Sequence, residues 1–270
     1  MNEKVILITG ASSGVGKACA NYLLEQGHII FGTRRTAVFS ESQYNSKKVN
    51  ILPLELRDKK SMIDVINTII KICGRIDVVI NNAGVGIGGP VEDTPIEEAK
   101  RIMDINFFGG VQLIQEILPI FRKQNYGLII NISSLAGRFS LPFQGFYAAT
   151  KFAIEAISEA LYMELKNSSL NVVLIQPGDL STNFTNNRKE FISKESHLEL
   201  SFKKALSILK NDERSGASPI AVAYIIERII KSKRHGFRYV LGKEAWYVRI
   251  LHSLLSDRIF LHFLARHYGL

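Results

Sequence analysis

Three residues near the middle of the chain have the types and spacing needed to move a proton onto or off a substrate oxygen. Ser134 precedes Tyr147 by 13 positions, and Lys151 follows Tyr147 by four. Residues four apart share one face of a helix, so the ammonium of Lys151 is expected beside the phenol of Tyr147. A neighbouring positive charge favours the phenolate and lowers a tyrosine pKa from its usual value near ~10. The Ser134 hydroxyl can hold a carbonyl or alcohol oxygen beside that phenol.

The Tyr-x-x-x-Lys spacing does not identify this site by itself, because it also occurs at Tyr44 and at Tyr162. Tyr44 lies in a polar stretch that predicts a loop. Tyr162 lies deep in a helical pattern, where a tyrosine packs with its hydroxyl in water. Tyr147 alone follows an apolar strand that ends in serine, and it begins a helix. Its context therefore selects Tyr147.

Short apolar runs alternate with amphipathic segments along the chain. We predict strands at residues 5–10, 28–33, 49–56, 76–84, 127–134, 171–178 and 237–242. We predict helices near 14–26, 60–73, 96–123, 147–166 and 219–233, the last with Ser218 as N-cap before Pro219. This alternation predicts an α/β fold, a doubly wound parallel sheet of the Rossmann type with helices on both faces, in a single domain over residues 1–270.

Two segments do not follow the alternation. Residues 183–217 are polar, with a short helical pattern around 198–210, and an insertion of this length is often a substrate-binding lid. Residues 243–270 predict an amphipathic helical tail with arginines beside an apolar stripe. The tail can cover the substrate cleft, pack against another subunit, or make weak peripheral contact with a membrane surface.

Apolar residues near Ser134 and in the insertion are candidates for the substrate wall, with ordinary core packing as an equal alternative. These are Leu135, Ala136, Phe139, Leu141, Phe143, Phe184, Phe191, Leu198, Leu200 and Phe202.

The formal charge of +9 is concentrated in the last third of the chain. Residues 1–185 carry 18 Lys and Arg against 17 Asp and Glu, whereas residues 186–270 carry 16 against 8. This excess fits a solvated surface, a membrane surface or an anionic substrate, and without a recognition motif no nucleic-acid partner is expected. The two cysteines predict reduced core residues, and no metal site is expected. Without a visible signal peptide or membrane span, we expect a cytoplasmic protein.

The first strand leads into a glycine-rich turn and then a helix, which is typical of a dinucleotide site. The turn supplies Gly10, Ser12, Ser13, Gly14, Val15 and Gly16. The second strand ends at Arg34 and Arg35, where sites that prefer NAD place a carboxylate. A guanidinium there suits a 2′-phosphate, so we predict NADP(H) over NAD(H), the alternative being that both arginines only solvate a loop.

Polar and glycine residues also follow two later strands at the same sheet edge. One group is Asn81, Asn82, Ala83 and Gly84, whose asparagines either lock neighbouring strands or mark a turn. The other is Gln176, Pro177 and Gly178, followed by Thr182.

Together these motifs resemble the classical short-chain dehydrogenase/reductases over roughly residues 4–242. TGASSGVG, NNAG, Asn106 in DINFFGG, NISS, YAATK and QPG occur in that family's order. The segment YAATKFAIEAISEAL is most similar to the branch that acts on steroids, retinoids and other lipophilic alcohols or ketones.

The resemblance implies a catalytic set of Asn106, Ser134, Tyr147 and Lys151. Tyr147 would be the general acid in reduction and the base in reverse, Lys151 would lower its pKa and bind the nicotinamide ribose, and Ser134 would orient the substrate oxygen. Asn106 would hold a helix distortion and a water. The remaining cofactor contacts would come from Asn82, Ala83, Gly84, Pro177, Gly178 and Thr182.

Two positions depart from the family pattern. Glu55, followed by Leu56, stands where the family often has an adenine-contacting aspartate. Ser13 stands where many NADP-preferring members have a basic residue, so the predicted preference depends on Arg34 and Arg35. The family also implies a homodimer or homotetramer, with apolar faces at 107–121 and 152–165.

The sequence thus predicts an NADP(H)-dependent oxidoreductase that transfers hydride between nicotinamide and a carbonyl or secondary alcohol of a lipophilic small molecule. The alternative is a non-catalytic NADP(H)-binding sensor or scaffold on the same fold. The complete set of Asn106, Ser134, Tyr147 and Lys151 argues against that alternative.

Overall fold

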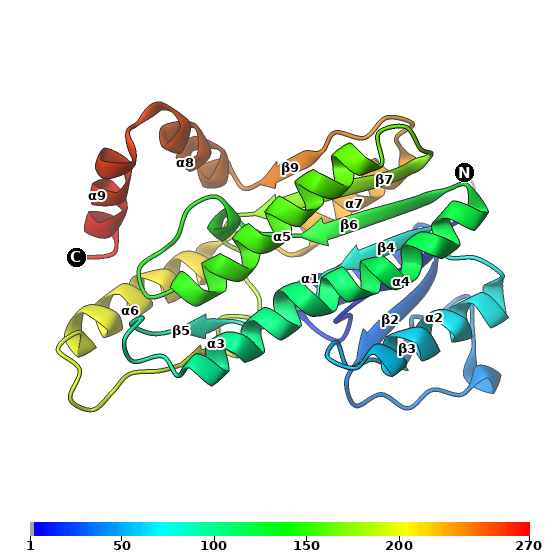
Figure 1. Cartoon of the computed structure of the whole chain (residues 1–270), viewed down its shortest axis with the longest axis horizontal. Coiled ribbons are helices and arrows are strands. Elements are labelled where there is room, and N and C mark those ends of the chain that lie inside the picture. Colours follow the sequence, from blue (N-terminus) through cyan, green and yellow to red (C-terminus); the bar gives the residue numbers. More distant parts are fainter. Residues whose placement is uncertain (1–2) are drawn as a thin grey trace.

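Seven parallel strands form the central sheet of the part of the chain that the computed structural model describes, residues 3–270 without the side chains of 243–245. Their order is β3-β2-β1-β4-β6-β7-β9 (Figure 1). The strands are β1 (Val5–Ile8), β2 (Ile29–Arg34), β3 (Asn50–Pro53), β4 (Val78–Asn81), β6 (Gly127–Ile132), β7 (Leu170–Pro177) and β9 (Arg238–Leu241). The predicted doubly wound parallel sheet is confirmed.

Helices cover both faces of this sheet (Figure 1). One face carries α2 (Lys59–Cys73), α4 (Gly109–Gln124) and α5 (Gly145–Glu164), and the other carries α1 (Gly14–Glu25) and α7 (Ile220–Lys231). Because strand side chains alternate, Val5 and Leu7 of β1 pack toward the first group, and Ile6 and Ile8 pack toward the second. Two hydrophobic cores hold the sheet rigidly between them.

The long helix predicted over 96–123 is interrupted. It consists of α3 (Ile96–Met103), a π-helical turn (Asp104–Phe108) and α4. The prediction of Ser218 as the N-cap of the 219–233 helix is wrong by one residue. Pro219 already has helical backbone angles and caps α7, which begins at Ile220.

The insertion at 183–217 has more regular structure than predicted. A short strand, β8 (Lys189–Glu190), pairs in parallel with β5 (Ile87–Gly88) to form a second, two-stranded sheet. The helix α6 (Glu199–Ser215) extends well beyond the predicted 198–210. Short 3₁₀ turns lie at η1 (Glu41–Gln43) and η3 (Leu135–Gly137).

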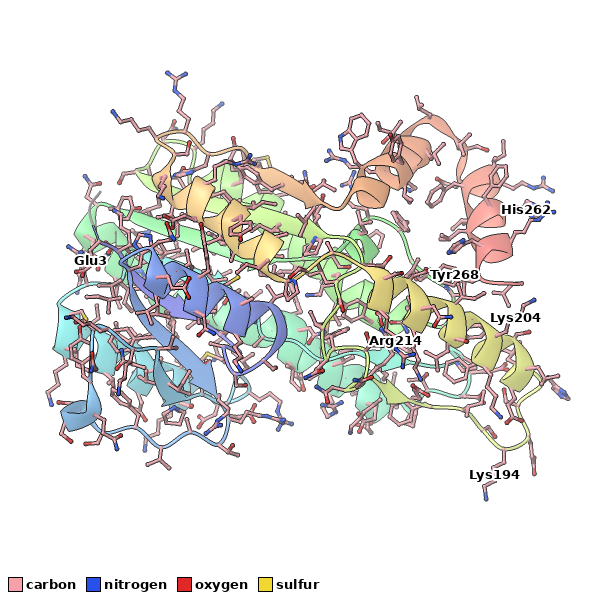
Figure 2. The ribbon with its side chains drawn as sticks, turned by 180° about the vertical axis from the view of Figure 1, so that it is seen from behind. Glu3, Lys194, Lys204, Arg214, His262 and Tyr268 are labelled. Atoms are coloured by element: carbon pink, nitrogen blue, oxygen red, sulfur yellow. The ribbon has the colours of Figure 1, made fainter. Side chains whose placement is uncertain are left out.

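The C-terminal tail is two helices rather than one continuous stripe. These are α8 (Lys243–Leu254) and α9 (Asp257–His267), separated where Leu255 and Ser256 have extended backbone angles. Figure 1 shows both at one end of the molecule, beyond β9. Tyr268 packs with Phe202 and Leu206, so the end of the tail is fixed to α6 (Figure 2). Within residues 3–270, no helix is long and apolar enough to span a membrane.

Candidate active site

A continuous cleft of ≈ 1800 Å³ opens at the carboxyl ends of the central strands, where ligands bind in doubly wound sheets. It brings together the predicted Ser134, Tyr147 and Lys151. It is also lined by most of the predicted cofactor residues: Gly10, Ser12, Ser13, Gly14, Val15, Arg34, Arg35, Glu55, Leu56, Asn82, Ala83, Gly84, Pro177, Gly178 and Thr182. Gly16 and Asn106 do not line the cleft, and both lie behind its wall.

The glycine-rich turn between β1 and α1 needs its glycines for two different reasons. Gly10 has φ +68° and Gly14 has φ +53°, a region that side chains rarely tolerate. At Gly16, a Cβ atom would lie 2.4 Å from the Gly10 carbonyl oxygen, so any larger residue would push the helix from the turn. The first residues of α1 receive no side-chain cap from Ser13. Their N–H groups and the helix dipole can therefore face an anion.

The asparagines at the end of β4 hold neighbouring strands and helices together through side-chain hydrogen bonds. This was one of the two roles predicted for them, the other being only to mark a turn. The side-chain nitrogen of Asn82 donates to the Thr9 carbonyl at 2.9 Å, and its backbone N–H donates to the Thr9 hydroxyl at 2.9 Å. Asn81 donates to Asn131 at 2.9 Å, and Asn131 donates to Ser158 at 2.8 Å. These bonds fix the cleft floor across β1, β4, β6 and α5.

The far end of the cleft is rich in arginine. Arg34 and Arg35 are exposed where β2 ends. Partial burial raises the pKa of Glu55, but hydrogen bonds from Arg57 and the charges of Arg57 and Arg35 outweigh it and lower that pKa. Sequence reasoning did not find Arg57, which lines the cleft and donates to the Glu55 carboxylate at 3.3 Å. The only indication of Arg57 in the sequence was that the loop after β3 contains an arginine.

The Tyr147 side chain is half-buried in the cleft wall, and its partial removal from water raises its pKa to about 12. Hydrogen bonding to Ser134 opposes this shift by stabilising the phenolate, and the positive charge of Arg188 acts in the same direction. Tyr147 therefore carries its proton throughout the neutral range in this structure.

The predicted effect of Lys151 on the pKa of Tyr147 stays a prediction, and the causes of the Tyr147 shift given above do not include this lysine. The ammonium nitrogen lies 5.8 Å from the centre of the Tyr147 ring and donates to the Ile132 carbonyl at 3.0 Å. Burial lowers the pKa of Lys151 to about 8, with Glu155 opposing the shift. Desolvation is the largest cause of both pKa shifts, and the amine bonds to a backbone carbonyl.

Asn106 lies in the π-helical turn and holds two elements together. Its side-chain oxygen accepts from the Val85 N–H at 2.8 Å, and its nitrogen donates to the Val85 carbonyl at 2.9 Å. The same nitrogen also donates to Thr150 at 3.2 Å, one residue before Lys151. The extra residue in a π turn is what aims this amide inward. Asn106 thus positions the cleft wall and the helix of Tyr147.

The substrate half of the cleft includes only part of the predicted wall. Leu135, Ala136, Phe139, Leu141 and Phe184 line it. Phe143 and Phe202 instead pack edge-to-face, with ring centres 5.4 Å apart, in the small core under α6. The remaining three predictions were also wrong, since Phe191, Leu198 and Leu200 do not line the cleft. Apolar type alone could not distinguish the wall from this core.

The remaining wall comes from residues that sequence reasoning did not assign to the site. Arg188 and Glu213 form an ion pair inside the cleft lining, although their polar surroundings in the sequence suggested solvated surface. The tail adds the apolar residues Val248, Leu251, Leu255, Phe260, Phe263 and Leu264. In the sequence, only the helical spacing of apolar residues in the tail indicated that one face of it packs against the rest of the protein.

The other two Tyr-x-x-x-Lys matches lie away from the cleft. The Tyr44 ring stacks on Phe31 with centres 5.8 Å apart, and it borders one of the two large cores. Tyr162 lies on α5, packs against Phe237 at 4.6 Å between ring centres, and is 45% exposed. Both contacts are structural, as expected from their sequence context.

A model of the short chain dehydrogenase family matches residues 4–193, so the chain belongs to the short-chain dehydrogenase/reductases. It is 43% identical over 244 residues to a 3-ketodihydrosphingosine reductase of Bacteroides thetaiotaomicron, covering 90% of this chain and 89% of that protein. A crystal structure of a short-chain dehydrogenase from Streptomyces avermitilis superposes with a TM-score of 0.80 at 26% identity, covering 100% of each chain.

A second solved structure shares the fold at lower sequence identity. The short-chain dehydrogenase/reductase from Burkholderia phymatum, solved in complex with NAD, gives a TM-score of 0.79 at 23% identity, covering 97% of this chain and 95% of that one. The chain is therefore an oxidoreductase of a family whose members bind nicotinamide dinucleotides.

Burial of Lys151 predicts a pH-dependent contribution to stability. Its pKa is about 8 when folded and near the usual ~10.4 when unfolded, so between these values the unfolded state binds more protons. Stability relative to Lys151→Met should therefore rise with pH in this window, by about 1.4 kcal/mol per unit. Urea unfolding of both proteins at pH 7.5 to 10 measures it. Lys166→Met, at an exposed lysine just after α5, is the matched control, and a pH-independent difference for Lys151→Met would contradict the expectation.

Proposed function

We propose that this protein is an NADP(H)-dependent reductase of a ketone carried on a lipophilic chain. The observation that carries the proposal is the phenol of Tyr147 in the wall of a cleft that Ser134, Lys151 and apolar residues of the tail also line. When bound, the dinucleotide supplies hydride to the carbonyl carbon.

The protonated phenol of Tyr147 suits the reducing direction. It can donate its proton to the oxygen of a carbonyl as negative charge develops there. The Ser134 hydroxyl can donate to the same oxygen and orient it. The buried ammonium of Lys151 adds positive charge in a region that excludes water, where charge acts most strongly. Oxidation would first require removing the proton from Tyr147.

The cofactor half of the cleft fits a dinucleotide phosphate. The glycine-rich turn leaves a shallow cradle at the N-terminus of α1, and a Cβ atom at Gly10 would fill it by meeting Ala83 at 3.0 Å. Arg34 and Arg35 stand at the end of β2 without a carboxylate on that strand, which favours a ribose 2′-phosphate. The pyrophosphate would lie at the turn and the 2′-phosphate at these arginines.

The substrate half favours a long apolar substrate. Its walls are aromatic and aliphatic, from η3, Phe184 and both tail helices. The name of the Bacteroides relative, a 3-ketodihydrosphingosine reductase, supports a ketone on a long-chain base as the substrate class. The insertion and the tail would act as lids, since each contributes residues to the wall.

A homodimer or homotetramer remains our expectation for the assembly. Phe108 is 56% exposed beside α4, and Phe152 and Met163 on α5 are 44% and 67% exposed. Phe108 ends the π-helical turn that leads into α4, and α4 and α5 both cover the same face of the sheet (Figure 1). Sedimentation equilibrium measures the assembly directly, and a monomer at micromolar concentration would exclude it.

Tyr147→Phe removes the proton donor and little else. Turnover of NADPH with a long-chain ketone should fall by ~10²–10⁴-fold, the usual size of a general acid contribution, while NADPH binding stays intact. Tyr162→Phe makes the same substitution in an equally spaced motif outside the cleft and should keep the wild-type rate. Wild-type turnover in Tyr147→Phe would exclude this role. A wild-type protein that binds NADPH but reduces no ketone would favour the sensor alternative.

Arg34→Ala and Arg35→Ala test the cofactor preference. Loss of a charge-assisted contact to a 2′-phosphate is worth about 1.5–3 kcal/mol, so kcat/KM for NADPH should fall roughly tenfold to hundredfold while that for NADH changes little. Arg228→Ala, at an exposed arginine on α7 outside the cleft, is the control. A wild-type preference for NADH would refute the assignment.

The outer side of the tail favours contact with an anionic membrane surface. Trp246, Tyr247 and Leu254 are 57%, 65% and 78% exposed, and Arg258 and Arg266 are exposed among them. Aromatic and apolar side chains with nearby arginines are typical of helices that lie in a membrane interface. The same two helices line the cleft on their inner side, so a lipophilic substrate would pass a short way from bilayer to active site.

Vesicle sedimentation tests this contact. The protein should sediment with vesicles containing anionic lipid at low salt, and about 0.5 M salt should release it because the attraction is screened. Leu254→Ser should weaken sedimentation. Leu200→Ser, which removes an apolar side chain 84% exposed on α6, should not. No sedimentation at low salt would exclude the contact.

A further inference from the structure

An arginine and a glutamate meet in the substrate half of the cleft. Arg188 lies just before β8, and Glu213 lies near the end of α6. The Arg188 Nη2 donates to the Glu213 Oε1. The Arg188 side chain is only 1% exposed and that of Glu213 is 12% exposed, yet both line the cleft. A buried ion pair contributes little to stability once desolvation is counted, so its presence in a cleft wall calls for another reason.

Both members of this pair keep unused hydrogen-bonding capacity. Nε and Nη1 of Arg188, and Oε2 of Glu213, are buried and have no partner among residues 3–270. Such unpartnered groups cost about 1–3 kcal/mol each, and native proteins seldom keep several together without a function. Together they offer two donors and one acceptor at one place in the cleft wall.

Nearby glycines fix where the guanidinium lies. A Cβ atom at Gly88 would come within 3.2 Å of the Arg188 Cδ, and one at Gly86 within 3.5 Å of its Cγ. The arginine stem therefore crosses a strip of backbone that carries no side chains. This close packing, together with the pairing of β5 and β8, holds the group in one orientation.

The pair lies next to the proposed proton donor. The Phe184 ring is 5.6 Å from the Tyr147 ring and 6.0 Å from the Arg188 guanidinium carbon, so Phe184 bridges the two. The charges of Glu213 and Arg188 also act, in opposite directions, on the pKa of Tyr147. The pair is therefore separated from the Tyr147 phenol by a single aromatic ring, and all four side chains line the same cleft.

Further carboxylates lie near the pair. Tyr268, where α9 meets α6 (Figure 2), has a pKa raised by burial first and then by the charges of Asp179, Asp212 and Glu213, with the charge of Arg188 opposing them. Lys189 also lines the cleft, so cations and carboxylates both occur in its wall. The group that favours a cationic substituent is therefore the unpartnered Oε2 of Glu213 itself.

We propose that Arg188 and Glu213 form a head-group subsite for a cationic amino-alcohol group next to the substrate carbonyl. The ammonium donates to Oε2 of Glu213, and the neighbouring hydroxyl accepts from Arg188. The alkyl chain then lies along the apolar tail residues, including Leu251, Phe260 and Leu264. This inference rests on the proposed reductase function and names which long-chain ketones the enzyme selects.

Three ketones of equal chain length test the subsite without any mutation. They are the 2-amino-1-hydroxy-3-ketone, its N-acetyl derivative and the unsubstituted 3-ketone, each assayed with wild-type protein and NADPH. We expect kcat/KM for the amino ketone to exceed the other two by about tenfold to hundredfold, since acetylation removes the charge that Glu213 recognises. Equal values, or a preference for either neutral ketone, would overturn the inference.

Glu213→Gln tests the residue itself. Glutamine keeps the shape and an acceptor for Arg188 but removes the negative charge, so the ratio of kcat/KM between amino and N-acetyl ketones should fall at least tenfold. Glu190→Gln is the matched control, because Glu190 lies on β8 and pairs with Lys210 of α6 at 2.7 Å outside the cleft. It should retain the wild-type ratio. An undiminished ratio in Glu213→Gln would exclude Glu213.

A binding measurement separates this inference from the reductase proposal. Calorimetric titration of NADP⁺-saturated protein with the long-chain 2-amino-1,3-diol should show binding that Glu213→Gln weakens at least tenfold. If that dependence holds while no ketone is reduced, the reductase proposal fails and the subsite stands. If ketones are reduced but the diol binds both proteins equally, the subsite fails and the reductase proposal stands. Absence of both binding and turnover overturns both.

Discussion

Desolvation of Tyr147 and Lys151 in the cleft wall is the constraint on which the rest of the site depends. It raises the pKa of Tyr147 to about 12 and lowers that of its neighbour Lys151 to about 8. The two shifts have opposite signs because desolvation disfavours the charged form of each group, the phenolate in one case and the ammonium in the other. The central sheet, the π turn, the insertion and the tail all contribute residues to the wall around them.

Turns at the ends of the strands form one half of the cleft, and the insertion and the tail form the other half. The cofactor half is built from backbone-rich turns at the ends of strands, and a network through Thr9, Asn82 and Asn131 fixes them to one another. The substrate half is built from the insertion and the tail, which pack on each other through Tyr268 and Phe202. The first half rests on the sheet between its two large cores, and the second half has a small core of its own.

The two halves differed in how far they could be predicted. Strands, the glycine turn and the cofactor-facing residues follow from local patterns, because parallel strands with alternating helices place their carboxyl ends at one edge. Gly16 was predicted as a cofactor contact and Asn106 as a catalytic residue, but neither side of that prediction is visible in the cleft lining, which includes neither residue. Among the expected substrate residues, Phe143 and Phe202 went to a core, and Leu200 went to solvent. An aromatic or aliphatic residue in a polar segment can face the cleft, a hydrophobic core or solvent, and the residue type alone does not distinguish these three.

The sequence by itself determined the fold class, the family and the residues that meet at the centre, since these depend on periodicity and on spacing within single elements. Only the tertiary structure decided the direction of the Tyr147 pKa shift and the meeting of Arg188 with Glu213. A pKa depends on burial by elements distant in the chain, and in this case desolvation is the largest cause of the shift. The arginine and glutamate are 25 residues apart in segments that look solvated, and folding α6 and the tail over the cleft is what removes them from water.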